Sequence, residues 1–223
     1  MEIESQRYVS EILEGREAVR IDILDDEASL IGRLHPVTRA VLADDELIQK
    51  LTHWRNVASR YFFTQFTATC DRTRDWLEKV VLNDSSRLLF IIHSKTGPVG
   101  QYGFKGLSHD SVELDNLIRG EMGGHPRLIH YAEIALVDWI FDVFELNRIR
   151  AFTLSDNHFV LNLHKSVGFK MGERIPLSKV EIQGEIHLQK GKPGGQSPVG
   201  LYAQGVELQR SDFVRREGPR HER

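Results

Sequence analysis

A glycine-bearing segment in the middle of the chain has the composition of an anion-binding loop. The segment RGEMGGHPR, residues 119–127, follows an alternating run that predicts a strand and precedes an amphipathic run that predicts a helix. Amide groups at a helix N-terminus are unpaired donors, and the helix dipole adds partial positive charge there. The glycines would let the backbone approach a phosphate, and an arginine stands at each end. The alternative is that the glycines only form the turn.

The spacing in this loop argues against two common phosphate ligands. A dinucleotide fold would show GxGxxG early in a βαβ unit, followed by an acidic residue about 20 positions later. A nucleoside triphosphate site would show GxxxxGK[ST], which is absent from the chain. The loop therefore predicts a pyrophosphate-bearing ligand of another kind.

Three side chains near this loop could move protons. Glu113 and Asp115 lie two residues apart on a predicted strand, so both project from the same face, where one could accept a proton through a water. We prefer Asp115, and the alternative is that both are solvent-facing charges. His164 lies on the sheet side of a predicted helix, where it could donate a proton, or could be a core-edge histidine bonded to backbone.

A cluster of aromatic and polar residues, 54–66, lies before and beside the second predicted helix and could line a pocket. Buried aromatic residues more often belong to a core than to a pocket, so the polar members are the better candidates. These candidates are Arg55, Asn56 and Tyr61. No histidine pair has metal-ligand spacing and Cys70 is alone, so we expect no metal site. The chain has no GxSxG motif, so we expect no serine nucleophile of that kind.

Hydrophobic periodicity and turn residues predict the elements that must position these groups. Strands are expected at residues 29–37, 88–93, 98–104, 111–118 and 148–154, from residue 169, and within 180–209. Helices are expected within 1–19 and at 44–58, 71–82, 128–144 and 158–167. This order predicts an α/β (α+β mixed-sheet) fold in which a right-handed crossover helix makes strands 111–118 and 148–154 parallel neighbours.

Composition limits the class of protein. The 223 residues are 40% apolar and 27% charged, as expected of a globular chain, and a net charge of -3 argues against a nucleic-acid partner. One cysteine excludes an internal disulfide and fits a reducing compartment. Neither a membrane span nor a signal peptide is visible, so we expect a cytoplasmic protein. The expected domain is 29–213, between an N-terminal extension, 1–28, and a disordered tail, 214–223.

The string NRIRAFTLSDNHFVLNLHKSVGFKMGE, residues 147–173, resembles the closing motif of the GNAT acetyltransferase superfamily. That motif reads N-x-x-[AS]-x-x-[LF]-[YH]-x-K-x-GF. Val160 replaces its small residue and Ser166 stands at its lysine position, one residue after Lys165. The positions that match are Asn157, Leu163, His164, Gly168 and Phe169. Residues 119–128 are similar to the family's pyrophosphate loop, [QR]-x-x-G-x-[GA], with Met122 at its first glycine. The segment WRN, residues 54–56, is similar to the branch of ribosomal-protein N-terminal and amino-sugar N-acetyltransferases.

The resemblance implies a splayed, mostly antiparallel sheet with one parallel pair, flanking helices, and acetyl-CoA bound between strands 111–118 and 148–154. His164 would protonate the leaving thiolate, and a primary amine would attack the thioester directly. The residues that would bind the cofactor are Leu117, Ile118, Arg119, Gly123, Gly124, His125, Arg127, Leu128, Asn157 and Lys165.

The resemblance leaves the acceptor open. We expect a small amine, such as an amino sugar or sugar nucleotide. The alternatives are a protein N-terminus, in which case residues 1–28 would fill a peptide groove, and a non-catalytic acyl-CoA-binding module. No membrane partner is expected. A homodimer is left open, with Phe141, Phe144 and the strands of 180–209 as its candidate surface.

Overall fold

One mixed sheet runs through the computed structural model, which describes residues 4–214. Its ten strands within that range lie in the order β1-β2-β4-β5-β6-β7-β10-β8-β9-β3. The strands are β1 (Ile21–Leu24), β2 (Leu30–Pro36), β3 (Thr64–Gln65), β4 (Leu88–Ser94), β5 (Gly97–Lys105), β6 (Ser111–Arg119), β7 (Arg148–Leu154), β8 (Lys170–Ile182), β9 (Glu185–Lys190) and β10 (Tyr202–Gln209). Only β6 and β7 pair in parallel, which confirms the predicted mixed α/β fold.

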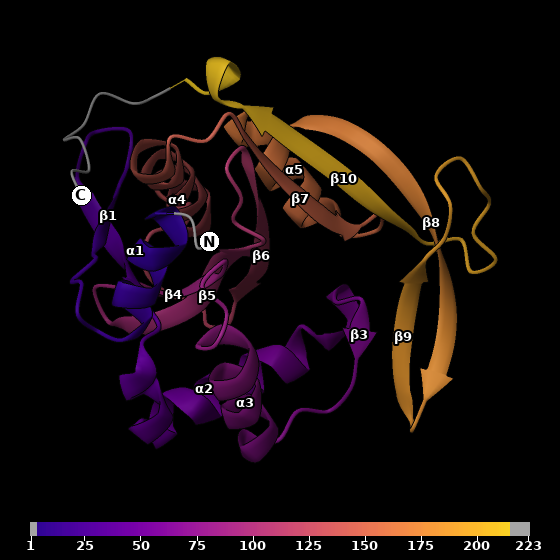
Figure 1. Ribbon diagram of the computed structural model, residues 1–223, viewed down its shortest axis with the longest axis horizontal. Helices are drawn as coiled ribbons and strands as arrows, with labels where there is room; N and C mark the ends of the chain where they lie inside the picture. The colour runs from indigo at the N-terminus through magenta and orange to yellow at the C-terminus, as the bar shows by residue number, and fades with distance from the viewer. Residues whose placement is uncertain (1–3, 215–223) are drawn as a thin grey trace.

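Helices cover both faces of the sheet (Figure 1). They are α1 (Glu4–Leu13), α2 (Asp45–Val57), α3 (Cys70–Trp76), α4 (Leu128–Phe144) and α5 (His158–Val167), with a π-helical turn at Leu77–Val81 and short 3-10 turns at Arg39–Ala43, Ser59–Tyr61 and Arg210–Asp212. Phe104 of β5 contacts Phe144 of α4, whereas Gln101 lines a cavity with side chains of α2 and α3. Successive side chains alternate between faces, so α4 lies opposite α2 and α3.

Residues predicted to be an N-terminal extension take part in the main core. Val9 and Ile12 of α1 are fully buried, and the Tyr8 ring lies 6.4 Å from that of Phe144. Strand β1, which the sequence analysis did not predict, pairs with β2 through Ile21 and Ile23. Helix α1 therefore packs beside α4, which differs from the expectation that this segment fills a peptide groove.

The sheet splits between its two parallel strands. Their pairing runs from Ser111–Arg148 to Leu114–Ala151. Beyond it, β6 bulges against β5, because Asp115 and Ile118 stand opposite Gly103 and Gln101, and Asn116 takes a positive φ of 59°. A bulge bends its strand and increases the local twist. The extra residue in β6 thus turns the strand away from β7 and opens the sheet there.

Two further expectations concern a dimer surface and a disordered tail. Phe141 and Phe144, offered as part of a dimer surface, are only 3% and 5% exposed and pack inside this chain. They are therefore not available to pair two copies, and a homodimer stays a prediction. Most of the tail expected to be disordered lies outside the described residues. Within 4–214, no helix combines the length and apolarity needed to cross a membrane.

Candidate active site

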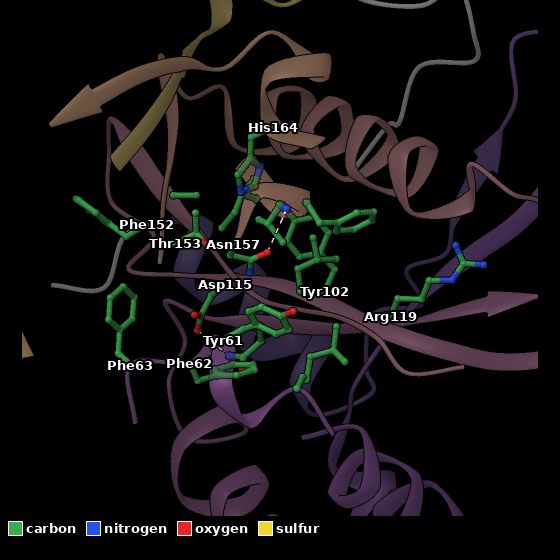
Figure 2. A pocket seen from close by; sticks show the side chains of 18 of the residues that line it. Tyr61, Phe62, Phe63, Tyr102, Asp115, Arg119, Phe152, Thr153, Asn157 and His164 are labelled. Atoms are coloured by element: carbon green, nitrogen blue, oxygen red, sulfur yellow. Dashed lines mark hydrogen bonds between the residues drawn. The ribbon is translucent and has the colours of Figure 1, made fainter. Parts of the chain in front are cut away.

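A cavity of about 320 Å³ occupies the split between β6 and β7. Figure 2 shows His164 and Asn157 entering it from α5, Phe152 and Thr153 from β7, and the aromatic side chains of residues 61–63 from the opposite wall. The predicted site residues that line this cavity are Glu113, Asp115, Leu117, Ile118, Arg119, Asn157, His164 and Tyr61. The split in the sheet therefore brings the expected catalytic groups together.

His164 is held in the cavity wall by a buried carboxylate. Its Nδ1 lies 2.5 Å from Oε1 of Glu133 on α4, and the two side chains are 3% and 0% exposed. A carboxylate only accepts hydrogen bonds, so Nδ1–H is the donor and Nε2 is left for another partner. The sequence analysis considered a backbone-bonded histidine, but the observed partner is a side chain that it did not identify.

Tyr102 of β5 adds a third titratable group to this wall. Its hydroxyl and Oε2 of Glu133 are both buried without a hydrogen-bond partner among the described residues. Burial raises the pKa of Tyr102 well above its usual value, and the carboxylates of Glu133 and Asp115 raise it further. Tyr102 is therefore a neutral phenol at physiological pH.

The two candidate bases on β6 share one ammonium group. Nζ of Lys105 lies 3.1 Å from both Glu113 and Asp115, which confirms that they project from one face. Oδ2 of Asp115 also accepts hydrogen bonds from Arg87 at 2.9 Å and Asn116 at 2.8 Å. Asp115 is thus the more heavily engaged carboxylate, and the identity of the base stays a prediction.

The glycine loop is shaped by one close contact and one backbone conformation. A Cβ on Gly120 would lie 2.1 Å from ring atoms of Trp54, so this glycine seats the loop against α2. Gly124 has a φ of 71°, and its Cβ would lie 2.8 Å from Ser94. Gly120 therefore serves packing, and Gly124 supplies a conformation that other residues rarely adopt.

The arginines that flank the loop have partners within the protein. The guanidinium of Arg119 donates to the Gly123 carbonyl at 3.4 Å and, in Figure 2, points away from the other labelled side chains. Arg127 pairs with Asp26 at 2.9 Å. His125 accepts a hydrogen bond at Nδ1 from the Arg127 amide. Each guanidinium group has five N–H donors, so phosphate contacts would draw on the donors that these bonds leave over.

The remaining predicted cofactor residues play different structural parts. Asn157 caps α5 by accepting from the Val160 amide at 3.3 Å, and so lies where the helix meets the cavity. Leu128 is buried in the core at the start of α4. Lys165 is exposed and is absent from the wall of this cavity. Its part in cofactor binding stays a prediction.

Of the predicted substrate residues, two line cavities and one holds backbone. Tyr61 lines the first cavity, and Arg55 lines a second cavity of about 400 Å³ that adjoins it. Asn56 donates to the Ala68 carbonyl at 3.0 Å and accepts from the Ala68 amide at 2.7 Å. Because its amide is engaged at both ends, Asn56 fixes the segment that precedes α3.

No cluster of histidine, cysteine or acidic side chains suited to a metal ion occurs in the part of the chain that the structure describes.

Solved structures with this fold include several N-acetyltransferases. A GCN5-related N-acetyltransferase from Brucella melitensis has a TM-score of 0.63 at 14% identity, over 88% of this chain and 80% of that one. Spermidine N-acetyltransferase from Vibrio cholerae, in complex with CoA and spermine, has a TM-score of 0.59 at 17% identity, over 80% and 95%. A Salmonella typhimurium acetyltransferase that modifies the N-terminal serine of ribosomal protein L7/L12 has a TM-score of 0.60 at 10% identity, over 86% and 99%.

The sequence itself places the chain within this class of acyltransferases. Residues 33–170 match the family described as acetyltransferase (GNAT) domain, which is more than half of the chain. No curated protein matches the sequence. The chain belongs to the GNAT acetyltransferase family, as the resemblance of its closing motif predicted.

Sequence reasoning missed Glu133, Tyr102 and Lys105 in this site. Glu133 is an acidic residue within the apolar helix 128–144, and a lone carboxylate on a buried face is a signal that could have been noticed. Tyr102 lies in the predicted strand 98–104 and Lys105 directly follows it, and neither belongs to a motif. Their relation to His164 and Asp115 depends on sheet register, which no local pattern in this sequence gives.

Proposed function

We propose that this chain transfers an acetyl group from acetyl-CoA to a primary amine, which attacks the thioester directly. The observation that carries the proposal is the cavity at the split between β6 and β7, with His164 in its wall. Where pairing with β7 stops, residues 115–118 present backbone to a narrow opening, which suits the extended pantetheine arm. Acetyl-CoA supplies the activated acyl group.

The residues of the cavity have separate tasks in this proposal. Asn157 and the backbone of 115–118 hold the pantetheine arm, and the loop 119–128 holds the pyrophosphate. Asp115, with Glu113 as the alternative, accepts the proton that the attacking amine loses, through a water. The new N–C bond forms as the C–S bond breaks, and His164 gives the proton at Nε2 to the leaving thiolate. Glu133 holds Nδ1 and keeps Nε2 directed away from α4.

A small acceptor is favoured by the wall that β3 and β9 form. The Leu188 amide of β9 donates to the Phe63 carbonyl at 2.7 Å, and Thr64 pairs with His187. Figure 1 shows the hairpin of β8 and β9 standing beside β3 on this side of the molecule. The adjoining cavity, about 400 Å³, is within the usual range for small-molecule sites. We therefore favour an amine such as an amino sugar or sugar nucleotide.

Protein acetylation is the second candidate. One related structure is described as acting on a ribosomal protein and another was solved with spermine, so the fold serves both kinds of acceptor. Helix α1 packs against α4 and supplies no residue to the walls of either cavity.

Thermal melting tests the cofactor assignment first. Acetyl-CoA at about 100 times its dissociation constant should add roughly 2.7 kcal/mol to the free energy of unfolding, a shift of several degrees. NAD is the control, and no shift is expected with it. A shift with NAD alone, or none with saturating acetyl-CoA, would overturn the cofactor assignment.

Thiol release from acetyl-CoA, with a panel of amines, then separates an enzyme from a binding module. His164→Phe should lower turnover by roughly 100-fold while the melting shift with acetyl-CoA persists. His158→Gln, an exposed histidine on the same helix, is the matched control. Unchanged turnover in His164→Phe would remove His164 from the chemistry, and acetyl-CoA binding without turnover of any amine would favour the binding module.

A further inference from the structure

The second cavity lies beside the cleft between β6 and β7, on the side proposed for the acceptor. Its volume is about 400 Å³, and it continues from the first cavity because both are lined by Phe62, Phe63, Lys105, Asp115 and Asn116. Helices α2 and α3 and strand β3 supply its other walls. An acceptor whose amine reaches the cleft would extend its remaining atoms into this space.

The charges around this cavity are unbalanced. Of the described residues that line it, Arg55, Arg72 and Lys105 are cations and only Asp115 is an anion. Asp115 is already bonded to Lys105 and to Arg87. Its charge is therefore shared with two cations other than Arg55 and Arg72, and the side of the cavity that these two arginines line stays positive.

Arg55 is a partly buried cation with no carboxylate partner in residues 4–214. Its guanidinium lies 3.9 Å from the ring centre of Phe62 and 4.7 Å from that of Phe66. Nη2 donates to the Thr64 carbonyl at 2.6 Å, while Nη1 is buried and without a partner among these residues. Burial, together with the like charge of Arg72, lowers the pKa of Arg55 to about 10. Such a group remains protonated near neutral pH and lacks a counter-charge.

Arg72 reinforces this positive region from α3. Its guanidinium lies 3.5 Å from the ring centre of Phe66, so that this ring contacts two guanidinium groups. Its partner is Glu185 of β9, an ion pair at the partly exposed rim. Glu185 is thus paired with Arg72, and no carboxylate of residues 4–214 pairs with Arg55.

We infer that the acceptor amine carries an anionic group, a phosphate or a carboxylate, which occupies the second cavity beside Arg55 and Arg72. A guanidinium group matches the geometry of both anions and binds them more strongly when water is excluded. The inference rests on the proposed function, because it assigns the part of the acceptor that does not react. A polyamine acceptor would place further positive charge beside the two arginines and is disfavoured by repulsion.

Melting of the CoA-loaded protein tests this inference. Saturation with CoA fills the pyrophosphate loop first, so that a second anion reports on the acceptor side. The probes are pyrophosphate and uridine diphosphate for phosphate, glutarate for carboxylate, and spermidine as a polycation. A probe that binds at about ten times its dissociation constant should raise the melting temperature by roughly 3 to 5 °C. Spermidine should give no shift.

Variants locate the binding. Arg55→Gln should weaken the anionic probe at least about tenfold, whereas Arg74→Gln should not change it. Arg74 lies on α3 near Arg72, but pairs with Asp45 and lines neither of the two cavities. The shift caused by CoA itself should persist in both variants.

The outcomes separate this inference from the proposed function. Absence of a CoA shift would contradict the cofactor assignment. A normal CoA shift with no response to any anion, or with an equal response in Arg55→Gln, would overturn the anionic acceptor alone. Whether pyrophosphate or glutarate binds identifies the anion as phosphate or carboxylate.

Discussion

His164 on α5 and Glu133 on α4 form a buried pair, 2.5 Å apart from Nδ1 to Oε1, in the wall of the cleft between β6 and β7. The two residues are 31 positions apart, and the crossover from α4 through β7 brings them together. A carboxylate on Nδ1 fixes the ring orientation and the tautomer, and stabilises the imidazolium when Nε2 is protonated. Glu133 is accordingly a positioning residue for the group proposed to protonate the thiolate.

Glu133→Gln should lower turnover without removing cofactor binding. The amide has nearly the same volume but no negative charge, so it should stabilise the imidazolium less and lower the pKa of the rate-controlling acid. We expect turnover to fall roughly tenfold or more, and the alkaline limb of the pH–rate profile to move to lower pH. The measurement is thiol release across pH, beside the melting shift with acetyl-CoA. Reduced turnover with an unmoved limb would indicate a purely structural role for Glu133.

Tyr102→Phe should leave stability unchanged or raise it. The hydroxyl is buried and has no hydrogen-bond partner within the described residues, so its removal takes away a desolvated polar group without the loss of a hydrogen bond. Tyr131→Phe is the matched control, because the Tyr131 hydroxyl donates to Asp26 at 2.5 Å, and loss of that bond should cost about 1 kcal/mol. Urea denaturation of both variants gives the comparison. A clear loss of stability in Tyr102→Phe would mean that a water connects this hydroxyl to Oε2 of Glu133.

Asp115→Asn and Glu113→Gln distinguish the two candidate bases. If Asp115 accepts the proton of the amine, Asp115→Asn should lower turnover roughly 100-fold, whereas Glu113→Gln should keep most of the turnover. Asp115→Asn should also lower the melting temperature more, because Arg87 and Lys105 both lose an ion-pair partner. A comparable loss of turnover only in Glu113→Gln would assign the base to Glu113.

Gly120→Ala should destabilise the protein through its contact with Trp54. The added Cβ would lie 2.1 Å from the indole ring, so the loop or α2 must move. Overpacking of this kind typically costs about 1 to 3 kcal/mol. A double-mutant cycle with Trp54→Leu is the check: the smaller side chain should accept the new methyl group, and the double variant should lose less than the sum of the two single losses. Strict additivity would show that the strain lies elsewhere in the loop.

Much of the fold could be predicted because its long elements carry strong local patterns. The periodicity of 128–144 gave the bounds of α4, and the capping residues Asn157 and Gly168 marked the ends of α5. Strands β1 and β3 escaped because they have only four and two residues, too few for a period to show. The bulge at Asn116 was missed because it depends on register with β5.

The candidate site was predictable where the family motif covers it and not where it depends on long-range pairing. His164 and Asn157 came from the closing motif, and both line the cleft. Neither a motif nor hydrophobic periodicity could identify Glu133 as part of the site, since its partner lies on another helix. Arg55 was expected to contact substrate, but its lack of a carboxylate partner becomes visible only when α2, α3 and β3 are assembled.

Stability should fall as pH decreases from 7.5 to 5.5, because of two half-buried histidines. The rings of His35 and His93 on β2 and β4 lie 4.7 Å apart, and desolvation lowers the pKa of each. The positive charges of nearby arginines lower the pKa of His35 further, and the charge of His35 lowers that of His93 further. The unfolded chain therefore takes up protons at a higher pH than the folded one. The two histidines contribute fully to stability above the pKa that they have in the unfolded chain, about 6.5. This contribution is lost as the pH falls toward their lower pKa values in the folded protein.

The double variant His35→Gln/His93→Gln should have a melting temperature that depends less on pH across this window. His109→Gln, which changes an exposed histidine in the turn before β6, should keep the wild-type dependence. Melting curves at half-unit steps of pH in one buffer mixture provide the measurement. The window lies above the range in which carboxylates titrate, so a slope retained by the double variant would have to come from other histidines, and the pair on β2 and β4 would no longer account for it.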